Sequence, residues 1–125
     1  GREQFNIDWL ESNLVGGEPA EDVQATLLEL SARSIALAIE RWCGEPEELA
    51  VCGGGAHNET LLRCLSALMP QTRVLTSDML GIGADWVEAL AFAWLARQNL
   101  MGLPGNLPAV TGARGERILG AVYPR

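Results

Sequence analysis

A glycine-rich loop is the part of this sequence best suited to hold a ligand. It follows a short apolar run, residues 49–52, that predicts a buried β-strand, and it precedes a predicted helix. Glycines carry no Cβ, so a ring or a phosphate can touch the backbone, and the free N–H groups of a helix start favour anionic atoms. From the pattern alone, both a nucleotide site and a tight turn built for packing stay open. The loop residues are Cys52, Gly53, Gly54, Gly55, Ala56, His57 and Asn58.

A dinucleotide-binding fold is one specific interpretation of this loop. Gly53 and Gly55 supply two glycines of that fingerprint, and Asp78, near the end of the next predicted strand, could contact a ribose or simply cap a turn. Asn58 occupies the place of the third glycine, where a side chain hinders close packing of helix on strand. We keep a dinucleotide-dependent oxidoreductase fragment as one alternative, and a non-catalytic interaction domain as another.

Three ionisable side chains near the predicted helix starts are further candidates. His57 is the only histidine, and it is interpreted as a structural loop residue that titrates near neutrality. Asp85 is interpreted as a charge that interacts favourably with a helix N-terminus. Glu88 stands between apolar neighbours on a predicted helix, and a solvated position is its simplest explanation because an unpaired buried carboxylate is costly.

Composition excludes several classes of function. The chain has 125 residues, a formal charge of -7 and no lysine, so a P-loop lysine or a Schiff base cannot come from it. Scattered arginines predict no nucleic-acid partner. Three cysteines without CxxC spacing predict neither a zinc site nor a disulfide, which suits a cytoplasmic protein. No apolar run is long enough to span a membrane, so no membrane association is expected.

The predicted elements place these candidates in an α/β fold. The chain length predicts one domain that buries about two thirds of its unfolded surface in a single core. Two strands joined by one helix must run parallel, which predicts a parallel or mixed sheet with packed helices. The predicted packing side of the last helix consists of Trp86, Leu90, Ala93 and Trp94. The expected segments are an arm and loop (1–18), a core (19–102) with helices over 19–43, 58–69 and 84–100 and strands over 49–52 and 73–76, and an extended tail (103–125).

Several separated motifs, in order over the whole chain, resemble the carboxyl-terminal portion of anhydro-N-acetylmuramic acid kinase. These motifs are Gly1-Arg2-Glu3 with Phe5-Asn6, the glycine loop 52–58, residues 83–96, Gly105-Asn106-Leu107-Pro108 and residues 110–113. The resemblance implies the sugar kinase, actin and Hsp70-like fold, in which two ribonuclease-H-like lobes flank a cleft. This chain would then form part of the second, actin-like ATPase lobe.

The resemblance also implies an activity. Members of the family use ATP and Mg²⁺ to open the 1,6-anhydro ring and phosphorylate O6 of the sugar. The product is N-acetylmuramic acid 6-phosphate, which is formed during peptidoglycan recycling in the cell wall. The chain is thereby expected to be part of a sugar kinase, a phosphotransferase of amino sugar metabolism.

Residue by residue, the resemblance implies that Gly53, Gly54, Gly55 and Asn58 form the adenosine-side loop and that Glu88 holds the anhydro sugar. The family's catalytic base and glycine-rich phosphate loop have no equivalent here, and no residue of this chain is expected to ligate Mg²⁺. The chain alone is therefore expected to be inactive. Its expected partners are ATP, the sugar, the missing amino-terminal portion and a second subunit in a homodimer.

Overall fold

The computed structural model describes residues 3–123, which separate into two compact units. The first unit contains the residues up to 47 together with 60–73, and the second contains 48–59 together with the residues from 74 onward. The single domain expected from the chain length stays a prediction. Of the motifs that carry the family resemblance, Gly1 and Arg2 lie outside the described residues.

The first unit begins with a short helix that the sequence interpretation missed. Helix α1, Ile7–Ser12, lies within the predicted arm and loop, and it starts where the Asn6 side chain accepts a hydrogen bond of 2.9 Å from the Trp9 N–H. The rings of Phe5 and Trp9 meet edge to face with centroids 5.0 Å apart. An N-cap and an aromatic contact thus stabilise a helix too short to show a clear apolar period.

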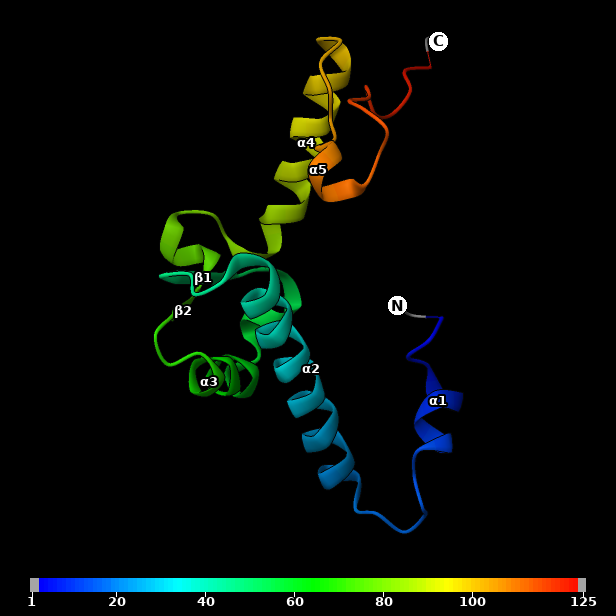
Figure 1. The fold of residues 1–125 in the computed structure, drawn as a ribbon, viewed down its shortest axis with the longest axis vertical. Coiled ribbons are helices and arrows are strands. Elements are labelled where there is room, and N and C mark those ends of the chain that lie inside the picture. Colours follow the sequence, from blue (N-terminus) through cyan, green and yellow to red (C-terminus); the bar gives the residue numbers. More distant parts are fainter. Residues whose placement is uncertain (1–2, 124–125) are drawn as a thin grey trace. The chain divides into compact units, whose positions relative to one another are not determined.

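Helix α2, Ala20–Cys43, agrees with its predicted limits (Figure 1). Pro19 precedes it, and Gly44 follows it with φ +71°, a conformation that favours glycine. Ala32 is its one buried residue within the described structure. Helix α3, Glu59–Leu68, begins directly after Asn58 as predicted.

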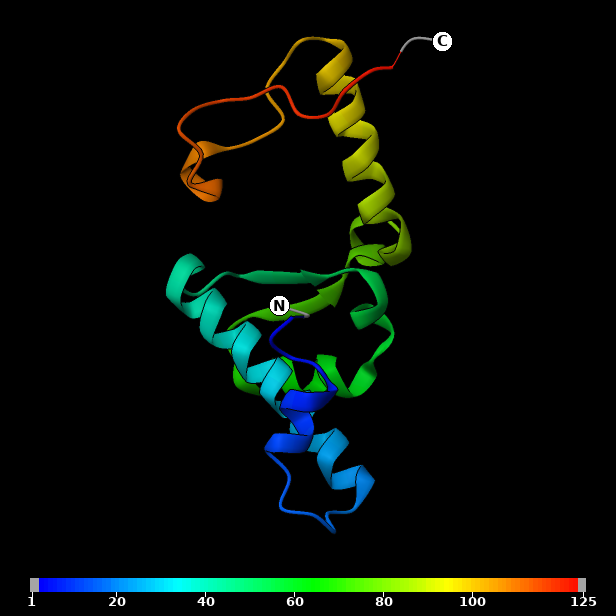
Figure 2. The same cartoon turned by 90° about the vertical axis from the view of Figure 1, so that its right-hand side faces the viewer.

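The second unit is organised by a small parallel sheet. Strand β1, Glu48–Val51, pairs with strand β2, Arg73–Thr76, and both run in the same direction (Figure 2). Both strands lie within one residue of their predicted positions. The predicted α/β class with a parallel sheet and packed helices is confirmed.

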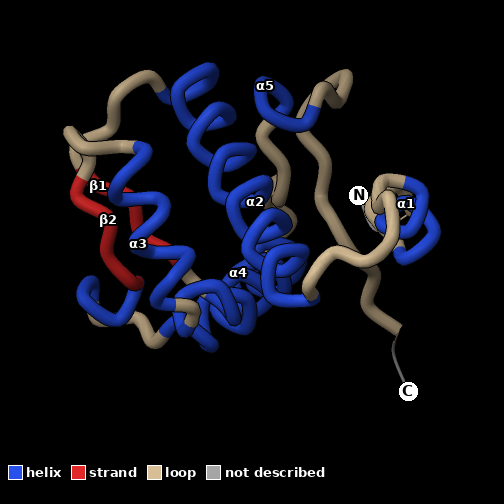
Figure 3. Tube along the Cα trace, turned by 90° about the horizontal axis from the view of Figure 1, so that it is seen from below, coloured by secondary structure: helices blue, strands red, loops and turns tan. Residues whose placement is uncertain are grey.

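Each strand is followed within one residue by a helical turn, and Figure 3 distinguishes helices, strands and loops by colour. The 3₁₀ turn η1, Gly53–His57, follows β1, and η2, Ser77–Leu80, follows β2. A third turn, η3, Ala84–Trp86, continues without a break into helix α4, Val87–Leu100. The predicted helix over 84–100 is thus present, with its first three residues wound more tightly.

The tail is less extended than predicted. Helix α5, Pro108–Thr111, lies within it, between a proline at its first position and Gly112 with φ +69°. Asn106, just before α5, is joined to the segment after α5: its side chain donates to the Gly115 carbonyl at 3.1 Å and accepts from the Arg117 N–H at 2.6 Å. These two contacts give Asn106 a structural role.

The predicted core is largely absent from the described residues. Of residues 3–123, six are buried: Ala32, Ala56, Leu65, Thr72, Ser77 and Ala84. On the predicted packing side of the last helix, Trp86 is 68% exposed, Leu90 52% and Trp94 49%. An apolar helix without a buried residue requires cover that residues 3–123 do not supply.

Candidate functional site

The glycine loop forms η1, at the carboxyl end of β1. Gly53 has φ +65°, so the turn itself requires a glycine there. Gly54 has no positive φ, and a Cβ built on it would meet no atom within 4 Å. The turn therefore accounts for Gly53, whereas neither conformation nor packing within residues 3–123 requires a glycine at position 54.

The last predicted member of the loop, Asn58, closes the turn. Its backbone N–H donates to the Gly55 carbonyl at 3.1 Å, and α3 begins at the next residue. Gly53, Gly54, Gly55 and Asn58 thus lie on one continuous turn between a strand and a helix. Because the chain has no lysine, a phosphate held here would be contacted by backbone N–H groups, by an arginine or through a metal ion.

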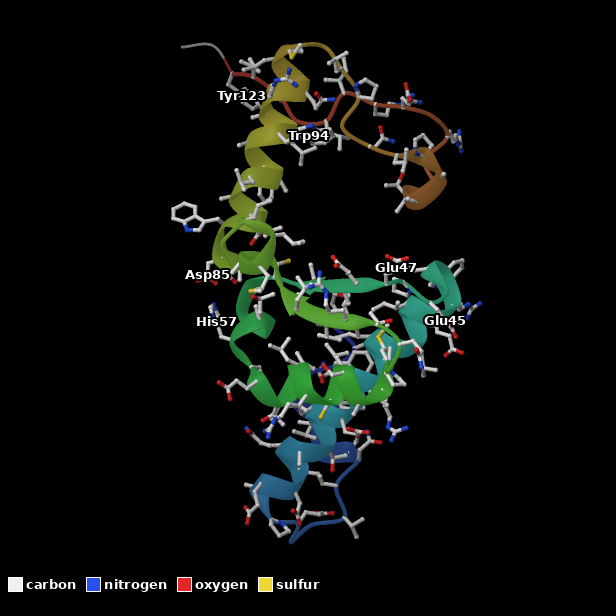
Figure 4. The ribbon with its side chains drawn as sticks, turned by 90° about the vertical axis from the view of Figure 1, so that its left-hand side faces the viewer. Glu45, Glu47, His57, Asp85, Trp94 and Tyr123 are labelled. Carbon is white, nitrogen blue, oxygen red and sulfur yellow. The ribbon has the colours of Figure 1, made fainter. Side chains whose placement is uncertain are left out.

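An ion pair that the sequence did not reveal joins this loop to η3. The Nε2 atom of His57 lies 3.0 Å from Oδ1 of Asp85, and the two side chains face one another in Figure 4. The hydrogen bond to Asp85 raises the pKa of His57, with further contributions from the charges of Asp85 and Asp78. The pair spans 28 positions of sequence, and no spacing rule relates residues so far apart.

Asp78 and Asp85 each lie where the sequence predicted, but each carboxylate also makes a contact that the sequence did not predict. Asp78 lies in a turn as expected, and its Oδ1 also accepts a long contact of 3.4 Å from the Ala84 N–H at the start of η3. Asp85 is near a helix start as expected, but its carboxylate pairs with His57. Both loops that follow the strands are thus connected to η3.

Glu88 lies in the first turn of α4 and is exposed. No hydrogen bond or ion pair joins its carboxylate to another residue of the described range 3–123. A carboxylate in the first turn of a helix is stabilised by the helix dipole while its oxygens stay free to accept hydrogen bonds. The structure places Glu88 three residues after Asp85, one helical turn along the same segment.

Other possible sites in the described residues are limited. No group of three histidine, cysteine, aspartate or glutamate side chains within residues 3–123 could hold a metal ion. The helices described there include none that is long and apolar enough to cross a membrane. A cavity of about 390 Å³ in the first unit lies between α2 and the segment after α3, and none of the predicted site residues lines it.

Comparison with known proteins finds a family model that matches residues 1–125, described as Anhydro-N-acetylmuramic acid kinase. Three similar proteins carry that name, each matched over 99% of this chain and 34% of its own length. The protein from Thiobacillus denitrificans is 59% identical over 127 residues. Those from Nitrosomonas europaea and Pseudomonas paraeruginosa are each 56% identical, over 124 and 126 residues.

The chain therefore spans about a third of the length of these relatives. The comparisons do not support the predicted carboxyl-terminal position of that third.

The His57–Asp85 pair predicts a measurable titration. Because the pKa of His57 is raised in the folded chain, the pair's contribution to stability is complete below the unfolded pKa. It is lost as the pH rises through the folded pKa. NMR titration of the single imidazole should give a midpoint above 6.5, the ordinary value, and Asp85→Asn should lower it. A wild-type midpoint at or below 6.5 would contradict the pair.

Proposed function

Because the chain belongs to the anhydro-N-acetylmuramic acid kinase family, we propose that it is part of an ATP-dependent kinase acting on 1,6-anhydro-N-acetylmuramic acid. Its part in the reaction is to contact the adenosine side of ATP and the sugar. The dinucleotide-dependent oxidoreductase and the interaction domain are the alternatives that this proposal replaces.

The observation that carries the nucleotide role is the open surface at Gly54. A glycine that neither the backbone conformation nor the local packing requires is explained when a ligand touches the backbone at that point. Gly53 shapes the turn, and Gly55 with Asn58 continues the same surface into the start of α3. These four residues are the proposed adenosine contacts.

Glu88 is the proposed sugar contact. Its exposed carboxylate can accept hydrogen bonds from sugar hydroxyls, which are stronger when the acceptor is charged. In the proposed reaction, water adds to C1 of the sugar as the C1–O6 bond breaks, and the proton of the water goes to the catalytic base in the remaining protein. O6 takes the γ-phosphoryl group of ATP, and ADP leaves. Glu88 orients the sugar and takes no proton in this scheme.

The remaining two thirds of the protein supply what this chain lacks. We assign to them the catalytic base, the phosphate loop and the protein ligands of Mg²⁺, which neutralises phosphate charge when bound. The exposed apolar residues of α4 support the proposal that further protein packs against this helix. The chain would then form part of one actin-like lobe of a larger kinase. A cytoplasmic location, expected from the cysteine pattern, and a homodimer, implied by the family resemblance, remain predictions.

A chimaera tests the proposal directly. This chain replaces the matching residues of the Thiobacillus denitrificans relative, to which it is 59% identical. We expect the chimaera to phosphorylate 1,6-anhydro-N-acetylmuramic acid with ATP, measured by coupled ADP release and by mass of the product. The relative lacking the matching segment is the negative control. A chimaera that unfolds at the relative's temperature yet transfers no phosphate would overturn the proposal.

Within the chimaera, Gly54→Ala should weaken ATP binding about tenfold without loss of stability, because its Cβ enters open space where the nucleotide is proposed to lie. Calorimetric titration and thermal unfolding provide the two readouts. Gly115→Ala is the matched control outside the loop, since its Cβ meets only the mobile end of Arg117. Gly53→Ala should instead cost about 1–2 kcal/mol of stability through its positive φ. Unchanged ATP affinity in Gly54→Ala would remove the nucleotide role.

Glu88→Gln should raise the KM for the sugar about tenfold or more, as expected when a hydrogen bond to a charged group is lost. The KM for ATP should change little, and steady-state kinetics of the chimaera separates the two values. Glu116→Gln, which neutralises an exposed carboxylate in the tail, is the matched control. If both variants give the wild-type KM for the sugar, Glu88 is a solvated helix-start residue.

A further inference from the structure

The short turn η3 connects two segments with different proposed ligands. It packs against η1, which carries the adenosine-side glycines, and it continues directly into α4, which carries Glu88. Asp85 and Glu88 are three positions apart, so a shift of Asp85 moves the backbone that carries Glu88. The position of η3 relative to η1 therefore sets the spacing between the glycine loop and the sugar contact.

Two features hold η1 and η3 together. Each contributes a buried alanine, Ala56 at 7% and Ala84 at 4% exposure, and such small side chains allow close backbone approach. The His57–Asp85 hydrogen bond of 3.0 Å adds a polar contact between them. His57 is the last residue of η1, two positions after Gly55, so the contact acts directly on the glycine loop.

We propose that His57 and Asp85 form a positioning link that couples nucleotide binding at the glycine loop to sugar binding at Glu88. The inference rests on the proposed function. A nucleotide that orders η1 would, through this link, also order η3 and the start of α4, so that the sugar meets Glu88 already in place. Linkage makes the effect reciprocal, and the sugar tightens nucleotide binding by the same factor.

The size of the coupling is limited by the exposure of the pair. The side chains of His57 and Asp85 are 63% and 69% exposed, and an exposed ion pair is weakened by solvent. We therefore expect a factor of about two to five in sugar affinity. His57→Arg keeps a positive donor at the same position and should preserve this factor, whereas His57→Ala and Asp85→Ala should remove it.

The test measures sugar affinity of the chimaera by calorimetry with and without a non-hydrolysable ATP analogue. In the wild-type chimaera the analogue should lower the sugar Kd about two- to fivefold. The ratio of the sugar Kd without the analogue to the sugar Kd with it should fall to one in His57→Ala, in Asp85→Ala and in the double variant. In His57→Arg this ratio should return to the wild-type value. Equal loss in the single and double variants identifies one shared interaction. Glu116→Gln should keep the wild-type ratio.

The outcomes separate this inference from the proposed function. An active chimaera in which the analogue leaves the sugar Kd unchanged, or in which His57→Ala keeps the full ratio, overturns the link and leaves the kinase assignment intact. A folded but inactive chimaera overturns both. Thermal unfolding of each variant distinguishes lost coupling from lost structure, and His57→Arg must restore the ratio, since a purely steric role for the imidazole would not predict this rescue.

Discussion

Parallel pairing of β1 and β2 is the constraint on which the second unit depends. Since two parallel strands end at the same edge, the turns that follow them, η1 and η2, start from that edge together. Asp78 from one turn and His57 from the other both contact η3. The segment that begins α4 is thus held by polar contacts from both loops at one sheet edge, where α/β proteins commonly bind ligands.

The polar groups of this edge contrast with the apolar surface of α4. At the loop, backbone atoms and the open space beside Gly54 suit a ligand. Along α4, the apolar side chains of Leu90 and Trp94 are about half exposed, because no segment of the described residues covers them. Both features accord with the proposal that further protein completes the binding surface and covers α4.

Local sequence patterns predicted the limits of most helices and strands. They did not predict which segments would pack over the apolar faces of those elements. The limits of α2, α3 and both strands followed from proline, glycine and apolar periodicity, because these signals act within a few residues. The short helices α1 and α5 were missed because neither is long enough to show an apolar period. α1 is capped by Asn6, and α5 is bounded by Pro108 at its start and Gly112 at its end. The predicted packing residues of α4 are not buried in the described residues. Periodicity shows which face of a helix is apolar, but it does not show which segment packs against that face.

The family, the glycine loop between strand and helix, and the positions of Glu88 and Asn58 on these elements can all be inferred from the printed residues. Only the folded chain shows that His57 pairs with Asp85, and that Gly53 is required by its φ whereas Gly54 borders open space. Helix and strand signals come from residues that are close together in the sequence. An ion pair over 28 positions and the free space beside a glycine depend instead on which distant segments come together when the chain folds.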